Sequence, residues 1–213
     1  ERKSHILSKK EKELTAYHEA GHAIVASVLP YADPVHKISI ISRGRAAGYV
    51  LKLPIEDRKL QSKKEFLDDI AVALGGYVVE KTIFGDLTTG PSNDLQVASA
   101  LARDMVAKYG MSEKLGAVAF ESQPGRPMFG QRLEEKGYSE EVGAKIDAEV
   151  SKIIEDSMKR AHEIITTHRE ALNDIAKTLI EVETIEQKQF EEILVRNKIK
   201  PKKKLDIEHQ PLV

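Results

Sequence analysis

The first part of the chain alternates apolar and polar positions at the spacing of an α-helix. Over residues 9–29 the apolar residues recur three and four positions apart, which is the period of a helix with one buried face. Ser8 and Glu11 have the spacing of a capping box, and Pro30 stands where a helix would end. The pattern therefore predicts a helix over residues 9–29.

Two short segments then alternate with a period of two. Residues 35–40 and 49–53 each show strand-like alternation, and the glycine-rich residues 43–48 between them are typical of a turn. These residues predict a β-hairpin. Because an isolated pair of strands is only marginally stable, we expect the hairpin to pack on the first helix.

The middle of the chain returns to helical spacing. Ser62 and Glu65 form a second capping box, and an apolar face extends to Phe84, with Gly85 as the expected end of that helix. After a loop over residues 85–94, the pattern predicts a helix over about 94–108, capped by Ser92 or Asn93.

The last third predicts further helices. Residues 111–138 are rich in Gly and Pro, which indicates turns. From Ser139 onward two apolar stripes follow at helical spacing, and Thr184 with Gln187 is expected to cap a third, short helix. The basic residues 198–213 are predicted to be a disordered tail.

Composition narrows the function classes. The 213 residues carry a formal net charge of -1, with 41% hydrophobic and 31% charged residues, as in a globular, helix-rich protein. This balance and the 5% of aromatic residues give no indication of a nucleic-acid partner. The absence of Cys excludes disulfides and thiolate metal ligands, and no apolar run reaches the roughly 18 residues of a transmembrane helix.

The candidate chemistry lies in the first helix. Residues 18–22 read His-Glu-Ala-Gly-His, an HExxH motif. Positions four apart share a helix face, so His18 and His22 can present imidazole nitrogens to one metal ion. Zinc accepts such ligands with an open position for water, whose pKa it lowers to about 7. Glu19 is placed to act as the base that takes the proton of this water.

A catalytic zinc site needs a third protein ligand, and the residues alone leave three acids open. Asp94 lies in the first turn of a predicted helix, Glu80 on the preceding helix, and Asp86 in the loop between them. Each also has an ordinary structural explanation. Asp94 could stabilise the positive end of its helix dipole, and Asp86 could stabilise a turn. Glu80 could lie on a solvent-exposed helix face.

Several segments together resemble the protease domain of FtsH-type proteins, which are ATP-dependent zinc metalloproteases. The resemblance extends over residues 1–197, so it is far more specific than HExxH alone. The segments that carry it are residues 15–23, 40–49, 74–76, 83–85, 89–95 and 109–112. One departure lies at residues 77–81, where Tyr77 and Lys81 stand in place of the usual Arg and second Glu, so ion pairing near the site is open to question.

The resemblance implies a fold and a site. The fold would be mainly α with a small β-hairpin or sheet, formed by a zincin-like HExxH helix and a C-terminal helical bundle. Residues 1–197 would be the metalloprotease domain and 198–213 its tail. His18 and His22 would bind one zinc ion and Glu19 would be the general base. In the family the Asp of the Ser-Asn-Asp segment is the third ligand, and this role carries over to Asp94.

The family also implies partners. Its members are homo-hexamers in which an AAA ATPase, using ATP and magnesium, unfolds or extracts protein substrates, and an N-terminal segment anchors the protein in the membrane. In the bacterial inner membrane the protease would face the cytoplasm. No phosphate-binding loop motif occurs in these residues, so we expect a piece excised from a longer chain, soluble as a fragment.

The motifs leave the substrate contacts and two rival functions open. We expect an extended substrate to pair with a strand edge at Gly48, Tyr49, Val50 and Leu51. The rival functions are a zinc peptidase that works without an ATPase and a non-catalytic helical module for oligomerisation. Glu19 argues against the second, because a structural metal site needs no base.

Overall fold

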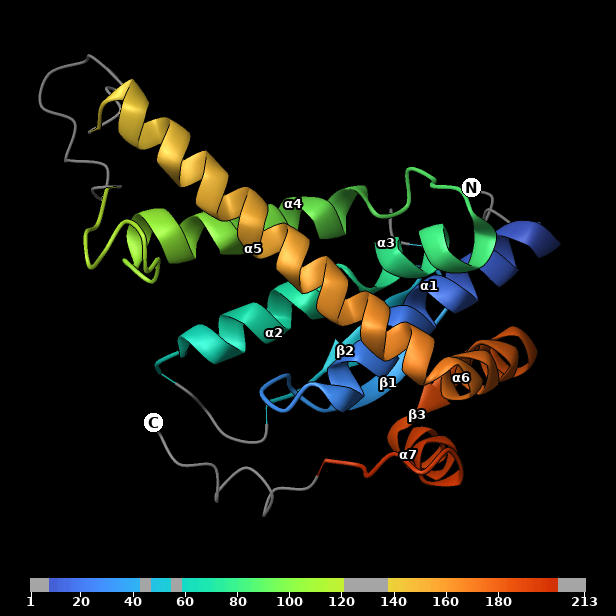
Figure 1. The fold of residues 1–213 in the computed structure, drawn as a ribbon. Coiled ribbons are helices and arrows are strands. Elements are labelled where there is room, and N and C mark those ends of the chain that lie inside the picture. Colours follow the sequence, from blue (N-terminus) through green and yellow to red (C-terminus); the bar gives the residue numbers. More distant parts are fainter. Residues whose placement is uncertain (1–7, 43–46, 55–58, 121–137, 203–213) are drawn as a thin grey trace, which may run out of the picture.

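The computed structural model describes residues 8–42, 47–54, 59–120 and 138–202, and Figure 1 shows how they are arranged. The predicted fold class, mainly helical with a small sheet, is confirmed. The elements of the described residues are, in chain order, α1 (Lys9–Val28), β1 (Val35–Ser39), β2 (Tyr49–Lys52), α2 (Lys63–Ala73), α3 (Gly75–Val79), the π-helical segment η1 (Glu80–Phe84), α4 (Ser92–Arg103), the π-helical segment η2 (Asp104–Lys108), α5 (Glu140–Thr167), α6 (Arg169–Val182), β3 (Thr184–Glu186) and α7 (Gln187–Arg196).

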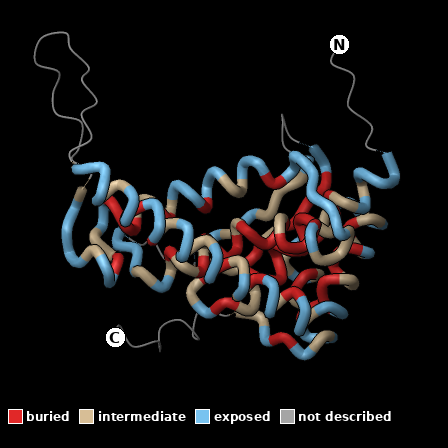
Figure 2. The backbone as a smooth tube through the Cα atoms, turned by 45° about the horizontal axis from the view of Figure 1, so that its top comes forward, coloured by how far each residue is buried: buried red, intermediate tan, exposed pale blue. Residues whose placement is uncertain are grey.

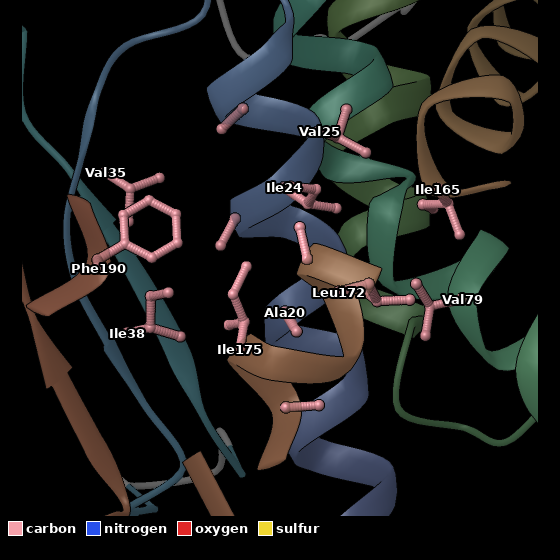
Figure 3. Close-up of a cluster of buried hydrophobic side chains, with 14 of the residues drawn as sticks. Ala20, Ile24, Val25, Val35, Ile38, Val79, Ile165, Leu172, Ile175 and Phe190 are labelled. Carbon is pink, nitrogen blue, oxygen red and sulfur yellow. The ribbon is translucent and has the colours of Figure 1, made fainter. Parts of the chain in front are cut away.

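Helix α1 is the centre of the largest hydrophobic cluster. Every residue from Thr15 to Ala26 except Tyr17 is buried, so most of its length has no solvent-facing side. Figure 3 shows α1 between two layers: Val35, Ile38 and Phe190 lie on one side, and Val79, Ile165 and Leu172 lie on the other. Figure 2 shows that most buried positions gather in the wider half of the molecule.

The sheet has three strands, in the order β2-β1-β3. The predicted hairpin is confirmed: Ser39 pairs with Tyr49 and Ile38 with Val50 in an antiparallel register. The prediction that Thr184 caps a helix is wrong, because Thr184 lies in β3 and pairs with Ser39. Helix α7 begins at Gln187 without a side-chain cap. The third strand was missed because its pairing is with residues about 145 positions away.

Both capping boxes are confirmed, at Ser8 with Glu11 and at Ser62 with Glu65. The single helix predicted to reach Phe84 is wrong: the chain turns at Leu74 and continues as α3 and then η1. It ends at Gly85, as predicted, in a left-handed conformation with φ of 68°.

The predicted helix over 94–108 begins two residues earlier, at Ser92, and gives way to the π-helical η2 at Asp104. Pro91 occupies the position before its first residue, so neither Ser92 nor Asn93 is the cap. Proline is suited to this place because it has no backbone N–H that would need a partner there.

Helix α5 crosses the molecule diagonally (Figure 1) and begins next to Ser139, where the helical pattern was predicted to resume. The Ser139 side chain caps the helix by accepting a hydrogen bond from the backbone N–H of Val142. The helix is tied to α2 by an ion pair between Arg160 and Asp68, whose Nη2 and Oδ1 atoms are 2.5 Å apart. Asp68 is 1% exposed, and its other oxygen accepts a hydrogen bond from the backbone N–H of Tyr31. A buried carboxylate is costly without partners, so these two contacts hold α2 to α5 and to the loop after α1.

The C-terminal segment is packed as far as Lys202. Ile199 belongs to the main hydrophobic cluster, and the Lys202 Nζ donates to the carbonyls of Ala26 and Ala32 near the end of α1. The rest of the predicted tail, 203–213, lies outside the described residues, as do residues 43–46 of the predicted turn and 121–137 of the Gly- and Pro-rich stretch.

Within the described ranges, every helix is too short or too polar to span a bilayer.

Helices α1 and α3 approach each other through glycines. A Cβ atom built on Gly75 would lie 2.8 Å from the carbonyl oxygen of Gly21, and one on Gly21 would lie 2.8 Å from that of Gly75. Both contacts are with backbone, which cannot rotate away. A side chain at either position would therefore force the two helices apart.

We expect Gly75→Ala to lower the free energy of unfolding by about 1–3 kcal/mol, because an overpacked contact strains the helix pair. Urea unfolding followed by circular dichroism measures this change. The matched control is Gly143→Ala in α5, where the new methyl group would meet only the Tyr138 ring at 3.4 Å. The control should be neutral or stabilising by up to about 1 kcal/mol. Equal stability of the two variants would contradict the close helix contact.

Candidate metal centre

The HExxH motif lies in the buried middle of α1, and its two imidazoles converge. The Nε2 atoms of His18 and His22 are 3.1 Å apart. Asp94, in the first turn of α4, completes the group: its Oδ2 is 3.1 Å from the His18 Nε2 and 3.5 Å from the His22 Nε2. Residues 76 positions apart in the sequence thus meet at one point.

The spacing of these three atoms fits a zinc ion. Ligand atoms at 2.0–2.2 Å from a tetrahedral ion lie roughly 3.3–3.6 Å from one another. The separations of 3.1 to 3.5 Å agree with this value. Among the described residues, His18, His22 and Asp94 form a group that could hold a metal ion, and they supply three donors. Three protein ligands leave a fourth position for water or substrate, the arrangement of a catalytic site.

The other two acids weighed as ligands lie elsewhere. Asp86 is exposed and accepts a hydrogen bond from the backbone N–H of Leu87, which stabilises the loop. Glu80 is fully buried, and its Oε1 lies 3.0 Å from the Nδ1 of His18, on the opposite side of the ring from Asp94. Glu80 therefore contacts a candidate ligand without pointing at the candidate metal position.

Each histidine ring is held through its Nδ1 atom. The Nδ1 of His22 is 2.7 Å from the carbonyl oxygen of Val72, which can only accept, so this nitrogen carries the hydrogen. The Nδ1 of His18 donates to Glu80 in the same way. In the neutral form of each ring, the Nε2 lone pair then lies on the side of Asp94. Such outer partners orient metal-binding histidines and make them better donors.

Glu19 lies beside His18 and His22 in α1, and its carboxylate contacts Gly48. It is 6% exposed, and burial raises the pKa of its carboxyl group, while the nearby His22 and His18 oppose this shift. A carboxylate whose pKa is raised toward neutrality is a more effective proton acceptor and donor near pH 7. A Cβ atom on Gly48 would lie 2.6 Å from the Glu19 Oε1, so the start of β2 touches the carboxylate.

In His18 and Asp94, hydrogen bonds between the site residues shift the pKa in the direction opposite to the effect of burial. Burial lowers the pKa of His18, but hydrogen bonds to Asp94 and Glu80 outweigh it and raise that pKa to about 9. Burial raises the pKa of Asp94, and its bonds to His18 and His22 outweigh this and hold it well below the usual range. A metal ion entering this site at neutral pH must displace a proton from His18. Its affinity should therefore increase as the pH rises toward 9.

The sequence interpretation missed how closely α3 approaches His18. A Cβ atom on Gly76 would lie 2.3–2.6 Å from three atoms of the His18 ring, so any side chain there would displace the imidazole. The Leu-Gly-Gly segment was noted only as part of a resemblance. Spacing along the chain does not show which ring the second glycine faces.

The departure at residues 77–81 leaves the site contacts in place. Tyr77 packs against the main hydrophobic cluster, Lys81 is exposed, and Glu80 between them keeps its bond to His18.

The residues expected to contact substrate lie at the edge of the sheet. In the described part of the chain β2 pairs with β1 alone, so its other edge is not covered by a strand. Gly48 precedes β2, and Tyr49, Val50 and Leu51 belong to it. Val50 packs against the main cluster, whereas the Leu51 side chain is 41% exposed. The contact of Gly48 with Glu19 brings this edge next to the candidate base.

Comparison with known proteins agrees with this geometry. Residues 5–193 match the family described as Peptidase family M41. The chain is 46% identical over 202 residues to the ATP-dependent zinc metalloprotease FtsH 1 of Sphaerobacter thermophilus, covering 94% of this chain and 31% of that protein. It is 47% identical over 195 residues to FtsH of Thermotoga maritima, covering 91% and 32%, and 45% identical over 195 residues to FtsH of Bacillus subtilis, covering 91% and 31%.

The chain spans about a third of the length of these relatives. The resemblance to FtsH-type proteases indicated by the sequence motifs is confirmed. From the match over nearly its whole length, the chain belongs to peptidase family M41.

Proposed function

We propose that this chain is a zinc-dependent metalloendopeptidase domain that hydrolyses peptide bonds in unfolded or membrane-extracted proteins. The observation that carries the proposal is the convergence of the His18 Nε2, His22 Nε2 and Asp94 Oδ2 atoms within 3.1–3.5 Å, beside the buried Glu19. A structural zinc site would use four protein ligands and no base. Three ligands with an adjacent carboxylate support a hydrolytic site instead.

In the proposed mechanism His18, His22 and Asp94 would hold one zinc ion, which when bound would supply Lewis-acid chemistry toward the scissile carbonyl and water. The Glu19 carboxylate accepts a proton from the attacking water and later donates it to the leaving amine. Glu80 and the Val72 carbonyl keep the two imidazoles oriented during these steps. Burial of Glu19 supports this role, because its raised pKa favours both uptake and release of a proton.

The remaining parts of the proposal concern the whole protein. The relatives are named ATP-dependent, and this chain matches about a third of each. We infer that an AAA ATPase domain, using ATP and magnesium, delivers substrate to this domain in a homo-hexamer. Membrane contact would be made by an N-terminal anchor outside this chain, with the protease on the cytoplasmic face of the bacterial inner membrane. Residues 1–197 would be the protease domain, and residues 198–202 pack against it.

Glu19→Gln should lower the rate of casein cleavage by about 10²–10⁴, because the amide cannot accept the proton of water. Zinc content, measured by atomic absorption, should stay at one per chain. The control is Glu13→Gln on the exposed face of the same helix, which should cleave at the parent rate. Full activity in the Glu19 variant would remove this residue as the base.

Loss of a residue that only orients a metal ligand lowers metal affinity about 10–100-fold. Asp94→Asn should lower the affinity for zinc by more than this, because Asp94 is proposed to bind the ion directly. The neutral amide is a poorer ligand for zinc than a carboxylate. Competition with a chromophoric chelator measures the affinity. Asp86→Asn, in the exposed loop that precedes α4, is the control and should bind zinc as the parent does. Unchanged binding in the Asp94 variant would exclude it as a ligand.

Substrate pairing with the edge of β2 should depend on main-chain hydrogen bonds. An extended strand offers its N–H groups alternately to the two sides. Methylation of the amide nitrogens of a peptide substrate, one at a time, should therefore raise KM at every second position beside the scissile bond. The intervening positions are the internal control. A KM that is insensitive to every methylation would contradict pairing along Gly48, Tyr49, Val50 and Leu51.

A further inference from the structure

The loop that follows η1 makes two hydrogen bonds to a buried carboxylate. The backbone N–H and the hydroxyl of Thr88 each lie 2.9 Å from the Oε2 of Glu80. The hydroxyl oxygen in turn accepts a hydrogen bond from the backbone N–H of Gly90 at 3.0 Å. Because an ionised carboxylate can only accept, the Thr88 hydroxyl donates its hydrogen to Glu80, while its oxygen accepts from Gly90.

The second oxygen of Glu80 continues this chain to the metal centre. Its Oε1 lies 3.0 Å from the His18 Nδ1, and the opposite nitrogen of the ring lies 3.1 Å from Asp94. The Glu80 side chain is 0% exposed, so bulk water does not reach its oxygens. Thr88 therefore binds one oxygen of the Glu80 carboxylate and His18 binds the other. Rotation of the carboxylate would break the contacts with both residues.

We propose that Thr88 is a positioning residue for metal binding, which acts through Glu80 to fix the ring of His18. The inference rests on the proposed function, and it adds a residue that touches neither the metal position nor a ligand. The segment from Gly85 to the first turn of α4 then determines two ligand positions: it supplies Asp94 directly and orients His18 through Thr88. This coupling explains why an exposed threonine makes such ordered contacts.

The test compares zinc affinity in three variants by competition with a chromophoric chelator. Thr88→Val removes the hydroxyl with little change of shape, and Thr88 is exposed, so core packing is not disturbed. We expect its affinity for zinc to fall about tenfold, the lower end for loss of an outer partner, because the backbone N–H still binds Glu80. Thr88→Ser keeps the hydroxyl and should restore the parent affinity. Thr89→Val, at the exposed neighbouring position, should also match the parent.

A double variant tests the route. If Thr88 acts through Glu80, Thr88→Val should cost no further affinity once Glu80→Gln is present. Replacing zinc by cobalt gives a second readout, because the visible absorption reports the geometry of the ligands. The Thr88→Val spectrum should differ from that of the parent, and the Thr88→Ser spectrum should match it.

Parent-like affinity and spectrum in Thr88→Val would overturn the inference, as would equal losses in the presence and absence of Glu80→Gln. These outcomes are distinct from a failure of the proposed function, which would appear as a parent chain that binds no zinc. They also separate positioning from general stability, because a thermal melt of Thr88→Val should remain close to that of Thr89→Val.

Discussion

The structure depends on the burial of three polar side chains in the middle of an apolar helix. His18, Glu19 and His22 are each less than 10% exposed, although α1 is packed on both sides by the main hydrophobic cluster. A polar group removed from water is costly unless it finds a partner. For the two histidines the required partners come from α2, η1 and α4: the Val72 carbonyl, Glu80 and Asp94. The site therefore forms only when these elements are correctly packed.

The close packing that buries the motif requires small residues. Gly21 of α1 meets Gly75 of α3 backbone to backbone, and Gly76 leaves room for the ring of His18. The turn at Leu74, which separates α2 from α3, places Gly75 and Gly76 against α1. A continuous helix through Phe84 would have been more regular, but the local irregularity allows the approach. The π-helical segment η1, which begins at Glu80, is a further departure of a kind that occurs frequently at functional sites.

The loop between η1 and α4 connects the chemistry to the fold. It begins at Gly85, which is in the left-handed conformation, and ends where α4 presents Asp94. Between these points the backbone N–H and the hydroxyl of Thr88 donate hydrogen bonds to Glu80. Residues 85–94 thus act on both sides of the His18 ring: Asp94 contacts the ring directly, and Thr88 acts on it only through Glu80. Glu19 contacts Gly48, which directly precedes β2, so the site adjoins the edge of the sheet. The candidate base therefore lies between the metal position and β2.

Local patterns in the chain predict the features that depend on near neighbours. The four-residue spacing of His18 and His22 places both on one face of a helix, and the two capping boxes define where α1 and α2 begin. The alternating segments predicted β1 and β2 for the same reason. The family resemblance named Asp94 as the third ligand, whereas spacing alone left Glu80 and Asp86 open.

Features that depend on distant residues are set by the packing of the elements. This packing brings Asp94 to the two histidines, turns Glu80 toward the other face of His18, and leaves Asp86 in solvent. It also pairs β3 with β1 and packs Ile199 into the core, neither of which has a local signal. Periodicity records only which side of an element is apolar. Which element packs against that side is set by contacts between residues far apart in the chain, and these contacts complete the site.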